Sequence, residues 1–178
     1  MNRVSVVGNS GAGKTTFAAA LAERLGAPHL ELDALFHQPD WRELPSEDFR
    51  ARVAAFVAAE RWVVDGNYSV VRDLVWGRAD TVVWLDPPRW LVMRRIIRRT
   101  LRRVVLGTEL WNGNRERWTN LLRLDPDKSI IAWSWSQHHA YRRRFAAAVE
   151  DPANAGITFL RVRGVRGIAG LLNEVGLT

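Results

Sequence analysis

The stretch GNSGAGKTT, residues 8–16, decides the fold of this 178-residue chain. Residues 8–15 fit the pattern G-x-x-x-x-G-K-[ST] in full. The β-branched run RVSVV precedes them, and a segment with helical apolar spacing follows at residues 15–25. Strand, glycine-rich turn and helix in this order indicate a phosphate-binding loop (P-loop), whose backbone N–H groups and helix N-terminus surround a phosphate. An ordinary glycine-rich turn is the alternative, and the complete motif with its flanking elements disfavours it.

Each residue of this stretch has an expected role toward a nucleoside triphosphate such as ATP. The Lys14 side chain is expected to reach the β- and γ-phosphates, which also makes it a catalytic candidate. The Thr15 hydroxyl is expected to ligate Mg²⁺. The remaining nucleotide-binding candidates surround these two along the loop, and they are Gly8, Asn9, Ser10, Gly11, Ala12, Gly13 and Thr16. Of these, Thr16 favours packing or a minor polar contact.

The composition bounds the class of protein. The net charge is +7, almost all of the positive charge is arginine, and 47% of the residues are hydrophobic. A basic balance implies an acidic partner, such as a nucleotide, another phosphorylated small molecule, a nucleic acid or an anionic membrane. There is no cysteine, and hence no disulfide framework. No apolar stretch is long enough to span a bilayer, and the P-loop comes too early for a signal peptide, so a cytoplasmic location is predicted.

The pattern of the whole chain predicts one domain, residues 1–178, in which strands alternate with helices. Strands are expected at residues 3–7, 29–32, 61–64, 81–86 and 157–162. Helices are expected at residues 15–25, 46–60, 69–76, from the Pro87-Pro88 pair to 106, 129–150 and 165–175. This alternation predicts a three-layer α/β fold with a five-stranded parallel sheet. Residues 33–45 are expected to be irregular, and residues 107–128 are the candidate for a short, mobile lid.

Three acids stand at the ends of predicted strands. They are Asp33, Asp65 and Asp86. Because ligands of open α/β sheets bind outside the carboxyl ends of the strands, all three can face one crevice. A role in the site is favoured for Asp33 and Asp65, whereas Asp86, before Pro87-Pro88, is equally well interpreted as a turn or cap residue.

Several motifs follow one another in a characteristic order. They are GNSGAGKTT, LDALFHQPDW at residues 32–41, RWVVDGNYS at 61–69, ADTVVWLDPP at 79–88, and then an arginine-rich helix. In this order the chain resembles the P-loop nucleoside and nucleotide kinase group. Within that group it most resembles adenylate-kinase-related proteins labelled "DNA topology modulation protein". The resemblance covers nearly the whole chain and implies a parallel sheet with the P-loop strand at its centre and a lid over the phosphates.

The resemblance also implies roles for single residues. Asp65 matches the acid that holds Mg²⁺ through water, and Asp33 matches an acid that contacts the acceptor hydroxyl in small-molecule kinases. Adenylate kinases carry Asp-Gly-Phe-Pro-Arg where this chain has DGNYS at residues 65–69, so the acceptor-binding arginine is missing there, although Arg72 lies nearby. AMP is therefore disfavoured as acceptor. Residues 33–41, with Tyr68, instead resemble the acceptor region of kinases for small hydroxylated molecules.

Arginines recur in pairs along the predicted helix that ends at residue 106. They are Arg94, Arg95, Arg98, Arg99, Arg102 and Arg103. At about 100° per residue these side chains occupy one half of the helix, and the apolar half is expected to pack on the sheet. Most of them are interpreted as a solvated face. Arg95 and Arg99 are predicted to stabilise the transferring phosphoryl group, and Arg115 in the lid is predicted to close on the nucleotide.

Two hypotheses of function follow. The first is a kinase that transfers the γ-phosphoryl group of Mg·ATP to a nucleoside, a nucleotide or a small hydroxylated metabolite. The second is a nucleotide-binding regulator whose basic surface binds DNA or another partner. Nucleic acid is the less favoured partner, because no helix-turn-helix or RNA-recognition motif is found. His37, His138 and His139 are interpreted as loop or packing residues rather than metal ligands.

Overall fold

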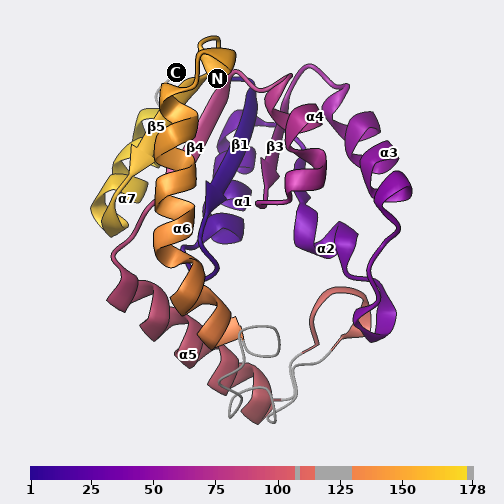
Figure 1. Ribbon diagram of the computed structural model, residues 1–178, viewed down its shortest axis with the longest axis vertical. Coiled ribbons are helices and arrows are strands. Elements are labelled where there is room, and N and C mark those ends of the chain that lie inside the picture. Colours follow the sequence, from indigo (N-terminus) through magenta and orange to yellow (C-terminus); the bar gives the residue numbers. More distant parts are fainter. Residues whose placement is uncertain (107–108, 115–129, 176–178) are drawn as a thin grey trace.

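A five-stranded parallel sheet forms the centre of the molecule (Figure 1). The computed structural model describes residues 1–106, 109–114 and 130–175. Its strands are β1 (Arg3–Gly8), β2 (His29–Glu31), β3 (Trp62–Asp65), β4 (Thr81–Leu85) and β5 (Thr158–Val162). They lie in the order β2-β3-β1-β4-β5, and each neighbouring pair is parallel. The predicted fold class is confirmed, and the P-loop strand β1 is central.

Helices cover both faces of the sheet (Figure 1). The helices are α1 (Lys14–Leu25), α2 (Leu32–Phe36), α3 (Ser46–Val57), α4 (Arg72–Trp76), α5 (Arg89–Leu106), α6 (Ile130–Glu150) and α7 (Gly164–Val175). Short 3₁₀ turns are η1 (Pro39–Trp41), η2 (Ser69–Val71), η3 (Trp111–Gly113) and η5 (Pro152–Asn154). Helices α1 and α7 pack on one face, and α3, α4 and α6 pack on the other. Among the described helices, none combines the length and the apolar content needed to cross a membrane.

The core follows from the alternation of side chains along the strands. On β1, Val4 and Val6 face α1, whereas Val7 joins a cluster with Phe145 of α6. Both faces are apolar because helices cover both, which is why the strands are continuous hydrophobic runs. The core therefore holds the strands rigidly and brings their carboxyl ends to one edge.

The segment 33–45 is not irregular throughout, contrary to the sequence-based expectation. Helix α2 begins at Leu32, and the turn η1 follows at Pro39. Leu32 is buried, and Leu35 and Phe36 pack against the cluster beneath α3. These tertiary contacts stabilise a helix that is too short to form alone.

Helix α5 lies across the carboxyl edge of the sheet, below it in Figure 1, and not on a sheet face. Its packing side is therefore narrower than expected. Val92 and Ile96 are buried, whereas Ile97 and Leu101 are 41% and 48% exposed. The expectation that the whole apolar half packs on the sheet is wrong, because α5 packs with a narrow side against the P-loop and α6.

Asp86 lies in the turn between β4 and α5, and it lines a small cavity together with Asn9 of the P-loop. It lies just after β4 with a side chain only 2% exposed, and its carboxylate receives Arg142 of α6 at 3.0 Å and Arg161 of β5 at 2.6 Å. The Asp86 carboxylate therefore connects β4, β5 and α6 through charge-assisted hydrogen bonds.

Replacing this carboxylate should reduce stability more than replacing an exposed one. We expect Asp86→Ala to lower the free energy of unfolding by about 2 kcal/mol, because two arginines lose their buried partner. Asp73→Ala removes the exposed pair with Arg50 and is the matched control, with a much smaller effect expected. Urea denaturation followed by circular dichroism measures both. Equal losses for the two variants would contradict the role of Asp86.

Candidate active site

The P-loop backbone is curled, and some of its amides already have partners: Gly8 donates to Asn67, and Ser10 and Ala12 donate to Asn9. Gly8, Gly11 and Gly13 have φ angles of 150°, 77° and 98°, which side chains other than glycine rarely allow. Helix α1 begins at Lys14, and no side chain caps its N-terminus. The first N–H groups of the helix are thus left for an anion, and the helix dipole adds to the attraction.

Neighbouring elements clamp the loop from outside. The Asn9 side chain donates to the Ser134 carbonyl and hydroxyl of α6, both at 3.0 Å, and lies 3.5 Å from the Nδ1 atom of buried His138. The Asn67 side chain, after β3, accepts from the Gly8 N–H and donates to the Gly8 carbonyl. Asn9 was predicted as a nucleotide contact, but its side chain anchors the loop to α6.

Lys14 extends from the start of α1 into the same cleft as Asp33. Its Nζ atom lies 3.4 Å from the Asn9 carbonyl oxygen. Burial lowers the pKa of Lys14, and the negative charges of Asp33 and Asp65 oppose that shift. A bound phosphate would add a further negative charge, and would therefore favour the charged form of this lysine.

Two carboxylates meet at the Thr15 hydroxyl. Its Oγ1 atom lies 2.8 Å from Asp65 Oδ2 and 3.0 Å from Glu31 Oε1. The parallel register of β2 and β3 pairs Glu31 directly with Asp65. The other oxygen of Asp65, which is almost fully buried, lies 2.7 Å from His29 Nε2. Sequence analysis missed Glu31. The one local indication of its role is its position near the end of the strand expected at residues 29–32.

This group of oxygens fits Mg²⁺. Hydroxyl and carboxylate oxygens are the ligands that Mg²⁺ prefers, and the ion keeps several waters and substrate phosphates in its shell. The described residues contain no group of three His, Cys, Asp or Glu side chains able to hold a metal by themselves. Thr15, with Asp65 and Glu31 nearby, therefore suits an ion that arrives together with a nucleotide.

Asp33 lies in the first turn of α2, and Tyr68 orients it. The Tyr68 hydroxyl donates to Asp33 Oδ1 at 2.8 Å, and among the described residues it is the one hydrogen-bond partner of this carboxylate. Rings of Phe36 and Phe49 pack against Tyr68 at 4.7 and 5.2 Å. Burial and the adjacent Asp33 raise the pKa of Tyr68, so its hydroxyl stays protonated and remains a donor.

Helix α5 brings three arginines to the opposite wall of the cleft. Arg95, Arg99 and Arg103 line it together with the P-loop. Arg95 donates to the Ala12 carbonyl at 3.0 Å. Ile96 packs so closely on Gly11 that a Cβ atom at Gly11 would lie 2.5 Å from it. The structure thus places Arg95 and Arg99, the two predicted catalytic arginines, beside the phosphate-binding loop.

The segment after α5 is hydrogen-bonded to residues 33–43, which we call the acceptor loop after the role predicted from the sequence. The Asn114 side chain accepts from the Trp41 N–H and donates to the Gln38 carbonyl, each at 2.9 Å. The Asn112 side chain donates to the carbonyls of Ala34 and His37. We call residues 111–114 the clasp. Trp41 has the unusual φ of 58°, and the buried Asn114 satisfies its N–H group.

Rings complete the contact between the clasp and the cleft. Trp111 stacks on His37 with ring centroids 5.7 Å apart. Its side chain also hydrogen-bonds to Glu31. The clasp therefore links the acceptor loop to the acids around Thr15. His37, interpreted from sequence as a loop residue, is part of this aromatic contact.

Three sequence candidates remain: the lid, its Arg115, and Thr16. Most of the predicted lid, residues 107–128, and its Arg115 lie outside the described residues. Thr16 is exposed at the edge of the cleft and also lines it.

The sheet order, the loop and the acids define the class of P-loop kinases, and comparisons with known proteins agree. The chain is 30% identical over 135 residues to the shikimate kinase of Synechococcus elongatus, a match that covers 64% of this chain and 70% of that protein. No protein-family profile matches. The chain belongs to the family of P-loop kinases that includes the shikimate kinases.

Solved structures show the same fold. A shikimate kinase from Acinetobacter baumannii, solved in complex with shikimate, has a TM-score of 0.55 at 18% identity, and the match covers 98% of this chain and 90% of that one. A gluconokinase from Sinorhizobium meliloti has a TM-score of 0.51 at 20% identity, with 99% and 90% covered. The finer resemblance, to proteins labelled for DNA topology modulation, stays a prediction.

The clasp should control the order of the acceptor loop. We expect Asn114→Ala to speed amide hydrogen exchange in residues 37–43 and to lower stability by about 1–3 kcal/mol, because the Trp41 N–H and the Gln38 carbonyl lose their partner. Hydrogen-exchange mass spectrometry measures the first effect. Asn154→Ala removes a contact to the Ala148 carbonyl in another part of the molecule and is the control. Unchanged exchange at residues 37–43 would show that the loop does not depend on the clasp.

Glu31 should make stability depend on pH when no metal is present. Burial raises the pKa of Glu31, so the folded protein binds this proton more tightly than the unfolded chain. The resulting cost to stability is absent below the unfolded pKa and grows as the pH rises through the folded pKa. In EDTA, Glu31→Gln should therefore raise the melting temperature more at pH 8 than at pH 5. Exposed Glu23→Gln is the control, and a lower melting temperature for Glu31→Gln at pH 8 would refute the prediction.

Proposed function

We propose that the protein transfers the γ-phosphoryl group of Mg·ATP to a hydroxyl group of a small acceptor. One observation carries the proposal: the P-loop, the Tyr68-oriented Asp33 and the arginines of α5 converge on one cleft. A donor site alone needs no carboxylate opposite the phosphates. An acid there, with no hydrogen-bond donor but Tyr68 among the described residues, suits an acceptor hydroxyl.

The donor side consists of the P-loop and Lys14. Loop amides and the N-terminus of α1 would hold the β- and γ-phosphates, and Lys14 would contact their outer oxygens. Mg²⁺, bound with the nucleotide near Thr15, Asp65 and Glu31, would supply neutralising charge to the phosphate oxygens. His29 holds Asp65 from behind, which fixes the carboxylate that faces Thr15.

The acceptor side consists of Asp33 and the surrounding loop. The acceptor oxygen forms a bond to the γ-phosphorus while the bond from that phosphorus to the β–γ bridging oxygen breaks. The hydroxyl proton passes to Asp33, whose other oxygen is held by Tyr68, and ADP leaves with the bridging oxygen. Catalysis would come mostly from position and charge, as is usual for phosphoryl transfer.

The arginines of α5 would act on the transferring group. Negative charge is spread over the equatorial oxygens of that group in the transition state, and a guanidinium can bind two of them at once. Arg95 is bound to the Ala12 carbonyl and so lies against the phosphate loop. Arg99 extends from the next turn of the helix into the same cleft.

The regulator hypothesis uses the same nucleotide site with a different output. A regulator would hydrolyse ATP slowly, and its nucleotide state would change the affinity for DNA or another partner. Acceptor-dependent turnover separates the two, because only a kinase makes a phosphorylated product. The position of Asp33 opposite the P-loop supports the kinase.

The first test is ADP release from Mg·ATP with a panel of nucleosides, nucleoside monophosphates, sugars and hydroxy acids. We expect one acceptor class to raise turnover well above the rate without acceptor. Asp33→Asn should reduce this rate by roughly 10²-fold or more, because the proton acceptor is lost. Lys14→Ala should reduce it by a similar factor, because charge stabilisation is lost.

Arg143→Gln, on the exposed side of α6, is the control and should keep the wild-type rate. Mass spectrometry of the product locates the new phosphate. If ATP binds but no acceptor changes the rate, or if Asp33→Asn retains the full acceptor-dependent rate, the proposed function is wrong.

A further inference from the structure

Helix α5 exposes a row of large apolar side chains. Trp90, Ile97, Leu101 and Val105 are 65%, 41%, 48% and 79% exposed. They follow one another at intervals of seven, four and four residues, so they lie along one side of the helix. We call these four residues the outer row. Single exposed apolar side chains are ordinary, whereas a continuous row of them is typical of a contact site.

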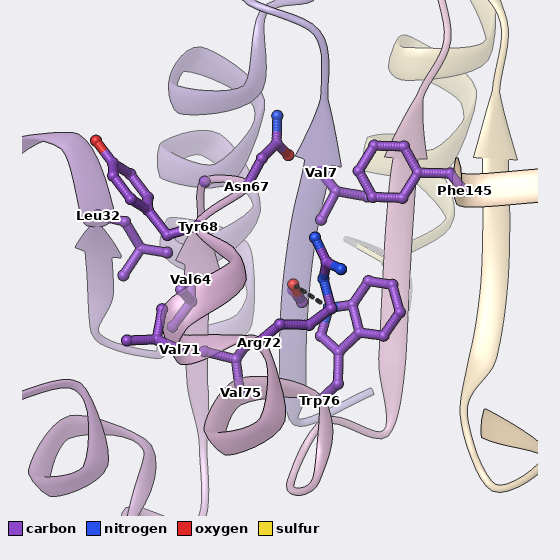
Figure 2. A pocket seen from close by; sticks show the side chains of 12 residues that line it. Val7, Leu32, Val64, Asn67, Tyr68, Val71, Arg72, Val75, Trp76 and Phe145 are labelled. Atoms are coloured by element: carbon purple, nitrogen blue, oxygen red, sulfur yellow. Dashed lines mark hydrogen bonds between the residues drawn. The ribbon is translucent and has the colours of Figure 1, made fainter. Parts of the chain in front are cut away.

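Large apolar side chains elsewhere in the molecule have a place in the core. Figure 2 shows Trp76 of α4 beneath the sheet edge, where it packs against the cluster that holds Val7 and Phe145. Its indole N–H donates to the Ser5 hydroxyl at 3.3 Å. The contact of α5 with the P-loop instead uses the buried Val92 and Ile96, and it leaves the outer row open to solvent.

Arginines accompany the outer row. Arg94, Arg98 and Arg102 are exposed, and they lie on the same side of α5 as the row or next to it. None of the 18 residues of α5 is acidic, so the helix itself offers these arginines no negative partner. The apolar stems of arginines can lie along an apolar surface while their guanidinium groups reach water. A partner for this side of α5 must therefore combine negative charge with an apolar layer.

Two other partners match these properties less well. A second copy of the chain, joined symmetrically through α5, would bring the same arginines against one another. A nucleic acid offers phosphates to the arginines, but phosphates and base edges are bound by polar donors, which Ile97, Leu101 and Val105 lack. The surface of an anionic bilayer offers both properties, because charged headgroups lie directly above the acyl chains. Tryptophan favours the boundary between these two layers.

We propose that α5 binds the surface of an anionic lipid bilayer. The helix would lie parallel to the surface, with the outer row among the first carbons of the acyl chains and Arg94, Arg98 and Arg102 at the headgroups. Amphipathic basic helices bind membranes in this way, through buried apolar area and attraction to anionic lipid. The contact involves one leaflet and requires no helix to cross the membrane.

The membrane side and the cleft side of α5 point in different directions. Arg99 lines the cleft, and it lies about half a turn around the helix from Trp90. Binding to lipid would therefore not use the arginines beside the P-loop. The inference goes beyond the proposed function and does not depend on it.

Sedimentation with lipid vesicles tests the proposal. The full chain, without nucleotide, is mixed with vesicles of equal parts phosphatidylglycerol and phosphatidylcholine, or with vesicles of phosphatidylcholine alone. We expect saturable binding to the anionic vesicles, much weaker binding to the neutral ones, and weaker binding as the salt concentration rises. Tryptophan fluorescence should shift to the blue on binding, and Trp90→Phe should reduce that shift.

Variants of the two kinds of side chain separate their contributions. The double variant Leu101→Ser with Val105→Ser should weaken binding about tenfold, because these side chains no longer enter the acyl layer. Arg98→Gln should weaken it about fivefold, since one basic side chain near an anionic surface contributes on that scale. The matched controls are on α6: Val149→Ser, at a residue that is 47% exposed, and Arg143→Gln should bind like the wild type.

Each outcome decides the proposal. Absent binding to anionic vesicles, equal binding to both kinds of vesicle, or unchanged binding by the double variant overturns it. A single-stranded oligonucleotide and analytical ultracentrifugation test the other partners: binding of the oligonucleotide but not of vesicles, or a dimer that the double variant dissociates, also overturns it. Because these measurements use neither ATP nor an acceptor, their failure is distinct from a failure of the proposed function.

Discussion

The curled backbone of residues 8–13 is the constraint on which the rest of the structure depends. A loop that keeps N–H groups for a ligand can use few of them for its own stability: Ser10 and Ala12 donate to Asn9, and other elements must hold the rest. A Cβ atom at Gly8 would lie 2.5 Å from the Leu85 carbonyl oxygen, and Gly11 is in similarly close contact with Ile96. Asn9 and Asn67 supply the remaining clamps, from α6 and from the end of β3. Strand β4 and helices α5 and α6 are thus required by the loop itself.

Negative and positive side chains line different walls of the cleft beside this loop. Glu31 and Asp65, at the ends of β2 and β3, lie on one side, and the arginines of α5 lie on the other. Lys14 lines the same cleft, and burial lowers its pKa while the negative charges of the acids oppose that shift. Opposite charges attract each other strongly where water screens them little. The acids and the arginines therefore stay on separate walls only because the fold holds each wall in place. The clasp, which joins Trp111 to Glu31 and Asn114 to the acceptor loop, helps to hold one wall.

Local patterns predicted the parts of the site that lie on one continuous segment. The P-loop is such a segment, and the parallel sheet follows from the alternation of strands and helices. Glu31 was missed because its role depends on the pairing of β2 with β3, which no local pattern reveals. Asp86 was ambiguous for the same reason: its partners, Arg142 and Arg161, come from distant elements. The apolar side of α5 was predicted too wide because the helix crosses the edge of the sheet.

The sequence by itself determined the fold class and the phosphate loop. Glycines that allow positive φ, a lysine and a threonine at set spacing, and β-branched runs before helices carry that information over a few residues each. Only the tertiary structure decided what surrounds the loop: which acids meet Thr15, and which arginines of α5 line the cleft. The physical reason is that burial and electrostatic pairing depend on distances between elements, and these distances are set by packing across the sheet and its edge.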